Sequence, residues 1–268
     1  MGVIGWPVFS SLSPVIHNAA FDALGLSNWR YVPLPVAPGR LPEALSGLEA
    51  LSFSGANVTM PHKEDAARLV ATQSEDAALI GAVNTIVVTA KGLAGHNTDA
   101  PGFARFLEKD TGFEVRDRTA LILGAGGAAR ACALALARMG VDTVVVAARS
   151  TGRAQGIAEA LVSLGSRFQV LSWDEASSTR PVVLVNATPV TRGLPIPELG
   201  PGQLVVDLVY RPAVTPLVAQ AREAGAAAFG GLGLLLHQAA LSFEMWTGRV
   251  PPLEVMSAAA LAQLAEEG

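Results

Sequence analysis

The sequence predicts an α/β protein built on two sheets, and three observations support this fold class. Through the first hundred residues, short runs of branched apolar residues alternate with helical patterns. From Thr119 onward a second series of strands is apolar on both faces, as a buried parallel sheet requires. The last part of the chain contains two helical patterns with no strand between them, so it has to pack on a domain that is already built. We therefore expect two domains with a boundary near residue 100.

The first sheet is expected to be mostly parallel. The strands GVIGW, YVPLPV and FSGANVT are followed by the helical patterns PVIHNAAFDALG, LPEALSGLEAL and PHKEDAARLVA. The stretch AVNTIVVTAKGLAGHNTD then predicts two strands joined through Lys91-Gly92 as a hairpin, and a helix from about Asp99.

The second sheet is expected to contain the strands TALILGA, DTVVVAA, PVVLVNAT and QLVVDLVY. The two C-terminal helices are expected at LLLHQAALSFEMWTG and PLEVMSAAALAQLAEE. The apolar face of the last helix, in LEVMSAAALAQLAEE, is equally compatible with a place in the core and with a dimer surface, which leaves a homodimer open.

Charge and composition indicate a small-molecule ligand. The 268 residues include 19 Lys and Arg against 23 Asp and Glu, and neither sign forms a run, so no nucleic-acid or membrane-surface partner is expected. The apolar stretch GGLGLLLHQAALSF is too short to cross a bilayer. Cys132 is the single cysteine, which rules out an intrachain disulfide and fits the cytoplasm. The four histidines lack metal-ligand spacing, so no metal is expected.

A glycine loop follows the strand TALILGA. The sequence GAGGAA matches G-x-G-x-x-G/A at Gly124, Gly126 and Ala129, between a strand and a helix. In this pattern the first glycine permits the tight turn, the second lets the backbone approach a pyrophosphate, and the small third residue allows close helix packing. The alternative is a glycine-rich turn without a ligand.

The residues after the next strand favour NADP over NAD. An NAD-binding protein usually places Asp or Glu here, whereas this chain has Arg149, Ser150 and Arg153. Cations and a hydroxyl suit a 2′-phosphate. The alternative is that they form only the solvated start of a helix.

Polar residues of the first half predict a second binding region. Ser11 and Ser13, two residues apart, have hydroxyls suited to a carboxylate; alternatively, Ser13 only caps its helix before Pro14. Amides, hydroxyls and a carboxylate are expected at the carboxyl ends of strands, where open α/β sheets bind ligands: Asn57, Thr59, Asn84 and Asp99. The alternative is that these are ordinary turn residues.

Lys63 is the unusual residue of this half. It lies in the expected first turn of a helix, where the partial positive charge of the N–H groups favours Asp or Glu. With Asp99 it supplies an ammonium and a carboxylate able to move a proton. The alternative is a solvated lysine.

The order of these motifs resembles the shikimate dehydrogenase family along nearly the whole chain. The stretches that carry the resemblance are SLSPVIHNAAF, GANVTMPHKE, GAVNT, GHNTDAPGF, LGAGGAAR, NATPV, VDLVYRPAVTPL and GGLGLLLHQAALSFEMWTG. The resemblance implies reversible reduction of 3-dehydroshikimate to shikimate by NADPH, in aromatic biosynthesis.

The resemblance also assigns residues to roles. It implies Lys63 and Asp99 as the catalytic pair, and it implies that the substrate is contacted by Ser11, Ser13, Thr59, Asn84, Asp99, Tyr210 and Gln238. It implies that the cofactor is held by Gly124, Ala125, Gly126, Gly127, Ala128, Arg149, Ser150, Arg153, Asn186, Thr188 and Gly231. The substrate domain would comprise residues 1–99 and 234–268, the Rossmann-type NADP domain residues 100–233, and the active-site cleft would lie between them.

Several positions depart from the family pattern. Ser10, His62 and Leu234 replace His, Phe and Met, and TRG follows NATPV where GM is usual. At the 2′-phosphate position the family's NRT is ARS, so Ala148 lacks the amide. A quinate/shikimate dehydrogenase that uses NAD is therefore one alternative, and a non-catalytic homologue that has kept the ligand site is another.

Overall fold

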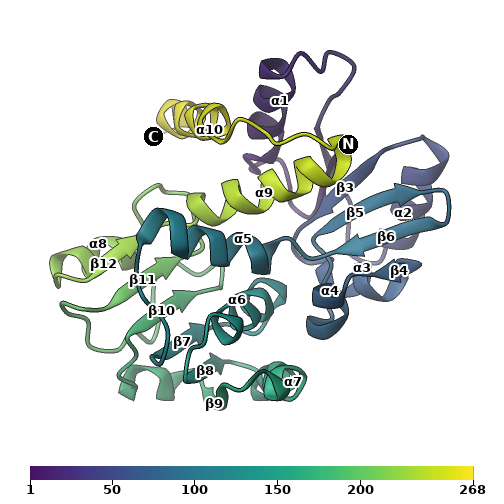
Figure 1. Cartoon of the computed structure of the whole chain (residues 1–268). Helices are drawn as coiled ribbons and strands as arrows, with labels where there is room; N and C mark the ends of the chain where they lie inside the picture. Colours follow the sequence, from purple (N-terminus) through teal and green to yellow (C-terminus); the bar gives the residue numbers. More distant parts are fainter. Residues whose placement is uncertain (268) are drawn as a thin grey trace. The chain divides into compact units, whose positions relative to one another are not determined.

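The computed structural model describes residues 1–267, which form two compact units (Figure 1). The first unit comprises residues 1–98 and 235–268, and the second comprises residues 99–234. The first is thus built from two separate stretches of the chain. No helix within residues 1–267 combines the length and hydropathy needed to cross a bilayer.

The first unit contains a six-stranded mixed sheet in the order β2-β1-β3-β5-β6-β4. Its elements are β1 (Gly2–Gly5), α1 (Ser13–Ala23), β2 (Val32–Pro35), α2 (Leu41–Ala50), β3 (Gly55–Val58), α3 (Lys63–Leu69), β4 (Thr72–Gln73), α4 (Glu75–Ile80), β5 (Thr85–Thr89) and β6 (Gly92–His96). The pairs β1–β2, β1–β3 and β4–β6 are parallel, whereas β3–β5 and β5–β6 are antiparallel. The predicted hairpin is confirmed as β5 and β6.

The two C-terminal helices, α9 (Leu232–Thr247) and α10 (Leu253–Glu267), are confirmed, and both contribute to the first unit. The indole N–H of Trp246 on α9 donates to the carbonyl of Ile86 on β5 at 2.9 Å. Helix α10 packs along α1, and the two helices lie side by side in Figure 1. The tail therefore completes a domain that the first hundred residues begin.

The second unit is a parallel six-stranded sheet in the order β12-β11-β10-β7-β8-β9. Its elements are α5 (Asp99–Phe106), a π-helical turn (Leu107–Thr111), β7 (Thr119–Leu123), α6 (Gly127–Arg138), β8 (Thr143–Ala148), α7 (Thr151–Leu161), a 3-10 turn (Val162–Leu164), β9 (Arg167–Ser172), a 3-10 turn (Asp174–Ser178), β10 (Val183–Asn186), β11 (Leu204–Asp207), α8 (Pro216–Glu223) and β12 (Ala227–Phe229). The chain reverses its direction of sheet growth after β9, as in Rossmann-type sheets.

Strands β4, β9 and β12, and helix α4, were not predicted. The three strands are short or partly exposed and each lies at the edge of a sheet, so they lack the continuous apolar run that marks the central strands. Helix α4 has only six residues, although its N-cap Ser74 accepts the N–H of Ala77. A Ser before two acidic residues was the available sequence signal for this helix.

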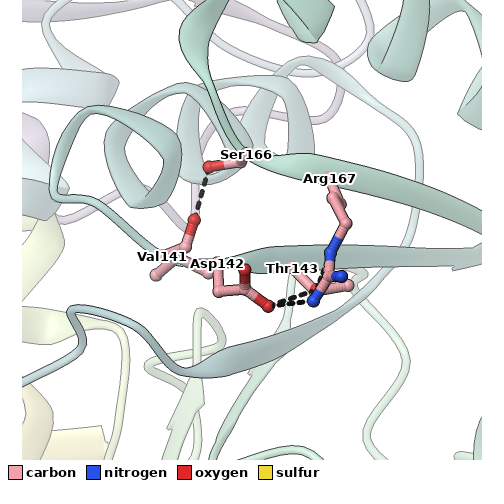
Figure 2. Close-up of polar contacts among 5 residues, drawn as sticks. All are labelled: Val141, Asp142, Thr143, Ser166 and Arg167. Carbon is pink, nitrogen blue, oxygen red and sulfur yellow. Dashed lines mark hydrogen bonds and ion pairs between the residues drawn. The ribbon is translucent and has the colours of Figure 1, made fainter.

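The amino ends of β8 and β9 are joined by polar contacts away from the glycine loop (Figure 2). Arg167 donates to the carboxylate of Asp142, and the hydroxyl of Ser166 donates to the carbonyl of Val141. Hydrogen bonds from Thr143 and Arg167 lower the pKa of Asp142. These contacts set the register of an edge strand at the end of the sheet opposite to its carboxyl ends.

Candidate functional site

The glycine loop of the second unit has the backbone that the sequence predicts. Gly124 follows β7 with φ +115°, a conformation open to glycine, and a Cβ there would lie 2.9 Å from the methyl carbon of Thr188. Gly126 precedes α6, and a Cβ built on it meets no atom within 4 Å. Space is therefore open above the backbone where a pyrophosphate is expected.

The start of helix α6 is suited to an anion. No side chain caps it and its first turn contains no acidic residue, so its N–H dipoles are not compensated by a neighbouring carboxylate. Ala125 is buried, whereas Gly127 and Ala128 are partly exposed. The predicted residues of this loop are thus contiguous on one turn.

Arg149, Ser150 and Arg153 lie at the carboxyl end of β8 and in the first turn of α7, and all three are exposed. Strands β7 and β8 are adjacent and parallel, so their carboxyl ends share one edge with the glycine loop. The two guanidinium groups are therefore presented at the edge where a dinucleotide is expected.

Asn186 and Thr188 belong to a buried network after β10. The Asn186 carboxamide donates to Asp207 at 2.9 Å and to the Val190 carbonyl at 3.0 Å, and it accepts from Thr188. Asp207 also accepts from the hydroxyl of Thr215 at 2.6 Å. The Asn186 side chain is therefore engaged by the protein itself. Asp207 and Thr215 were not predicted as members of this network. The available sequence signal was Asp207, a polar residue at the end of the apolar strand β11.

Tyr210 and Gly231 follow β11 and β12. Tyr210 is half-buried, and Gly231 is buried with its N–H donating to the carbonyl of Val209 at 3.1 Å. A Cβ on Gly231 would lie 2.0 Å from the carbonyl oxygen of Leu208. Only glycine fits this backbone approach.

In the first unit, Ser11 and Ser13 differ in environment. Helix α1 begins at Ser13, so the alternative that Ser13 is the N-cap is wrong, and the segment before it is a turn rather than an extended strand. The N–H of Ser13 donates to Oγ of Ser11 at 3.2 Å. Ser11 is half-buried and Ser13 buried. Ser11 thus satisfies a helix N–H while its hydroxyl proton stays available to a ligand.

Lys63 is the first residue of α3, which confirms its position in the first turn. Glu64 and Asp65 follow it, and they suit the helix dipole. The preceding His62 is buried, and its Nε2 lies 2.7 Å from the carbonyl of Val36. Lys63 is half-buried. Along the chain, Thr59 directly follows the end of β3 and precedes Lys63 by four residues.

Asn84 does not end a strand as predicted but immediately precedes β5. Because β5 runs antiparallel to β3, the amino end of β5 lies at the edge where β3 ends. Thr59 and Asn84 therefore share an edge of the sheet, although their strands run in opposite directions. Asp99 is buried at the first turn of α5, in the second unit.

Asn84 and Gln238 meet in a buried polar cluster. The amide nitrogen of Asn84 lies 3.4 Å from Oε1 of Gln238 on α9. Four further residues of this cluster were not predicted from the sequence: Thr85, Thr98, Tyr31 and Ser242. Thr85 and Thr98 are each next to a predicted residue, whereas Tyr31 and Ser242 lie in apolar patterns. Asn57, whose Oδ1 accepts from Tyr31 at 2.7 Å, is enclosed in this cluster and is therefore a structural link rather than a turn residue.

An aromatic stack supports this cluster from α1. The His17 ring is stacked on Tyr31 with centroids 4.3 Å apart, and it is fully buried. Burial, and secondarily the positive amino terminus, lower the pKa of His17 to about 3. Burial raises the pKa of Tyr31 well above its usual range. Both rings are therefore neutral at physiological pH.

The second unit contains a parallel sheet of Rossmann order with a glycine loop, and the first unit carries a lysine and a cluster of amides and hydroxyls. Together these features define a dinucleotide-dependent oxidoreductase. Comparison with known proteins gives the family. Residues 3–86 match "Shikimate dehydrogenase substrate binding domain", residues 106–220 match "Shikimate / quinate 5-dehydrogenase", and residues 231–261 match "Shikimate 5'-dehydrogenase C-terminal domain". The chain belongs to the shikimate dehydrogenase family.

Individual relatives cover the full chain. A shikimate dehydrogenase (NADP(+)) of Citrifermentans bemidjiense is 43% identical, over 100% of this chain and 96% of its own. The Thermus thermophilus shikimate 5-dehydrogenase, solved with NADP(H) and shikimate, is 37% identical with a TM-score of 0.85, over 97% of this chain and 98% of its own. A quinate dehydrogenase from Corynebacterium glutamicum, solved with NAD, is 31% identical with a TM-score of 0.87, over 97% and 98%.

Proposed function

We propose that this protein is an NADP-dependent shikimate dehydrogenase, which reversibly reduces 3-dehydroshikimate to shikimate in aromatic biosynthesis. The observation that carries the proposal is similarity to shikimate dehydrogenases (NADP(+)) over the whole chain, at 43% identity. The polar cluster of the first unit and the glycine loop of the second support the proposal, because the reaction requires a site for a hydroxylated ring and a site for a dinucleotide.

The predicted substrate domain, residues 1–99 with 234–268, is proposed to bind the substrate. Ser11 and Ser13 would hold its carboxylate. Ring hydroxyls would be contacted by Thr59, Asn84, Asp99, Tyr210 and Gln238. A polyhydroxylated ring needs both donors and acceptors, and amides and hydroxyls provide both.

Lys63 and Asp99 are proposed as the catalytic pair. When bound, NADPH supplies the hydride, and negative charge develops on the former carbonyl oxygen. The ammonium of Lys63 would stabilise this charge and donate a proton to the oxygen, and in the reverse direction Lys63 or Asp99 would accept that proton. Arginine could not replace Lys63, because a guanidinium does not release its proton at accessible pH.

The predicted NADP domain, residues 100–233, is proposed to hold NADP. The residues present fit this cofactor, since the Cβ position of Gly126 is open and the start of α6 lacks a competing carboxylate. Arg149, Ser150 and Arg153 would contact the 2′-phosphate. Asn186 would contribute to the cofactor site indirectly, by holding the loop that contains Thr188. Gly231 would contribute by allowing its backbone to approach Leu208 closely.

The second candidate is a quinate/shikimate dehydrogenase that uses NAD. Ala148 at the 2′-phosphate position and the similarity to a quinate dehydrogenase solved with NAD favour it. The exposed arginines at the carboxyl end of β8 weigh against it, because no carboxylate stands there to bind a ribose hydroxyl.

The deciding experiment crosses shikimate and quinate with NADP and NAD and follows the absorbance of the reduced nicotinamide. The expected result is that shikimate with NADP has the highest kcat/KM. A higher value for quinate or for NAD would favour the second candidate. No change in absorbance in any of the four combinations would contradict both candidate functions and would indicate a non-catalytic binding protein.

Cytoplasmic location and a homodimer also remain proposals. A single cysteine, which cannot form an intrachain disulfide, suits a reducing compartment. Dimerisation by pairing of the edge strand β2 is disfavoured. Val32 and Val36 direct their N–H groups to β1, so Pro33 and Pro35 occupy the outward positions and present no N–H to a second chain. A dimer would therefore use another face.

A further inference from the structure

Arg130 belongs to the helix that follows the glycine loop. It is the fourth residue of α6 and is half-buried, with its Nε enclosed by the protein. A cation near the start of a helix is unfavourable beside the partial positive charge of the unpaired N–H groups, and the first turn of α6 contains no acidic residue to compensate it. An anion from outside this helix would therefore stabilise both Arg130 and the helix start.

The guanidinium of Arg130 lies against helix α7. A Cβ built on Gly156 of α7 would be 3.8 Å from Nη2 of Arg130. Gly156 follows Arg153 by three residues, and residues at this spacing are neighbours on a helix surface. Arg153 is in the first turn of α7, and Arg149 directly follows β8. Arg130 therefore joins two other arginines at the amino-terminal half of α7.

Acidic residues of the neighbouring elements do not occupy these helix starts. The first turns of α6 and α7 contain none. Further along α7, Glu159 accepts from Gln155, and Glu175, which follows the adjacent strand β9, accepts from Ser172. The helix dipoles and the arginines therefore add to a positive potential at this edge of the sheet.

Arg130 and Arg153 each make a further interaction within the protein. A guanidinium has several N–H donors in a planar fork, so a phosphate can be added to the interactions that these side chains already make. The inference therefore depends on where Arg130 lies and on its charge, and it does not require an unoccupied side chain.

The two helix starts have different parts in the proposed cofactor site. The pyrophosphate is expected at the start of α6 and the 2′-phosphate at the start of α7, and one ribose connects them. The 2′-phosphate then has one side toward α6. Because Arg130 comes from α6 and lies against α7, it is on that side.

We propose that Arg130 is a specificity-determining residue, which binds the 2′-phosphate of NADP together with Arg149 and Arg153. The inference rests on the proposed function and deepens it. NAD differs from NADP only by the absence of this phosphate, so Arg130 contributes to the affinity for NADP and not to that for NAD.

The test measures the Kd for NADP and for NAD by calorimetry, with purified protein and without substrate. The variants are Arg130→Ala, which removes the guanidinium, and Arg130→Lys, which keeps the charge but not the planar fork. The matched control is Arg138→Ala, because Arg138 is an exposed arginine at the other end of the same helix, where a cation suits the dipole.

We expect Arg130→Ala to raise the Kd for NADP about tenfold, the size of one charge-assisted hydrogen bond. The Kd for NAD should stay within about twofold, and Arg138→Ala should leave both values within the same limit. Arg130→Lys should lie between wild type and Arg130→Ala, since an ammonium retains attraction for the phosphate without the paired hydrogen bonds.

Equal rises in the Kd for NADP and NAD would show that Arg130 only packs α6 on α7 and would overturn the inference, as would an unaltered Kd for NADP. A wild type that binds NAD as tightly as NADP would contradict the cofactor part of the proposed function and the inference with it. If Arg130→Ala does not fold, Arg130→Gln, which keeps a polar side chain, takes its place. Loss of shikimate oxidation by a wild type that prefers NADP would contradict the proposed reaction alone.

Discussion

Replacement of His17 by phenylalanine should flatten the acid side of the stability profile. Both ring nitrogens of His17 are buried without a hydrogen-bond partner, and its ring is stacked on Tyr31. Phenylalanine keeps an aromatic ring in the stack but cannot take up a proton. The change therefore isolates the consequence of burying an imidazole.

The expected magnitude follows from proton linkage. The folded state holds the pKa of His17 at about 3, whereas the ordinary value is 6.5, so the unfolded chain binds one more proton between these limits. Stability is fully present above pH 6.5 and is lost as the pH falls toward 3. Each pH unit inside the window is worth about 1.4 kcal/mol, so wild type should lose about 2 kcal/mol from this residue between pH 7 and pH 5.

The assay is urea unfolding of wild type and His17→Phe at pH 7, 6 and 5, followed by tryptophan fluorescence. Trp246 has its ring centroid 5.6 Å from that of His17, and three of the four tryptophans belong to the first unit, so this signal reports mainly the first unit. The variant should gain about 2 kcal/mol relative to wild type as the pH falls from 7 to 5. An overpacked ring would offset the two curves by a constant amount without changing this slope. Parallel curves would refute the reasoning, because they would mean that His17 takes up its proton within the fold.

Substitutions at three further positions test the proposed site. Lys63→Arg and Lys63→Ala should each lower kcat by about 10²- to 10⁴-fold with a much smaller change in the Kd for shikimate, and loss of affinity with turnover intact would contradict the catalytic role. Arg149→Ala should raise the KM for NADP roughly 10- to 100-fold and should have little effect on the KM for NAD. The control Arg167→Ala, at the opposite end of the same sheet, should change neither KM. Equal effects of Arg149→Ala on the KM values for NADP and NAD would exclude a contact with the 2′-phosphate. Gly231→Ala should lower the free energy of unfolding by about 1–3 kcal/mol in urea titrations, because its Cβ would overlap the carbonyl of Leu208, and an unaltered midpoint would contradict that approach.

Central elements were predictable because their local signals agree with their final environment. The strands β7, β8, β10 and β11 are continuous apolar runs and are buried in the middle of their sheet. The glycine loop has a signature that depends on backbone conformation alone, and Gly124 adopts the expected positive φ. Edge strands such as β9 and β12 carry weaker patterns, and these were missed.

Candidate site residues could be named from the sequence where a polar side chain interrupts a recognisable motif, as at Lys63, Asn84 and Arg149, and their roles stay predictions. The supporting residues were not. Tyr31 lies in an apolar strand pattern and Ser242 in an apolar helix pattern, so nothing local distinguishes them from core residues. Their role depends on partners far along the chain, such as the contact between Ser242 and Asn57 across 185 positions.

The sequence by itself determined the α/β class, the nucleotide loop and the types of polar group available for chemistry, because these follow from periodicity, backbone freedom and side-chain chemistry over short distances. Only the tertiary structure decided which of these polar groups are hydrogen-bonded to one another in the buried cluster and which are not. That distinction depends on how a few protons are shared in a buried cluster: the oxygen of Asn84 faces Thr98 because a backbone N–H can only donate. Such a constraint exists only after the residue before β5 and the segment after β6 have been brought together.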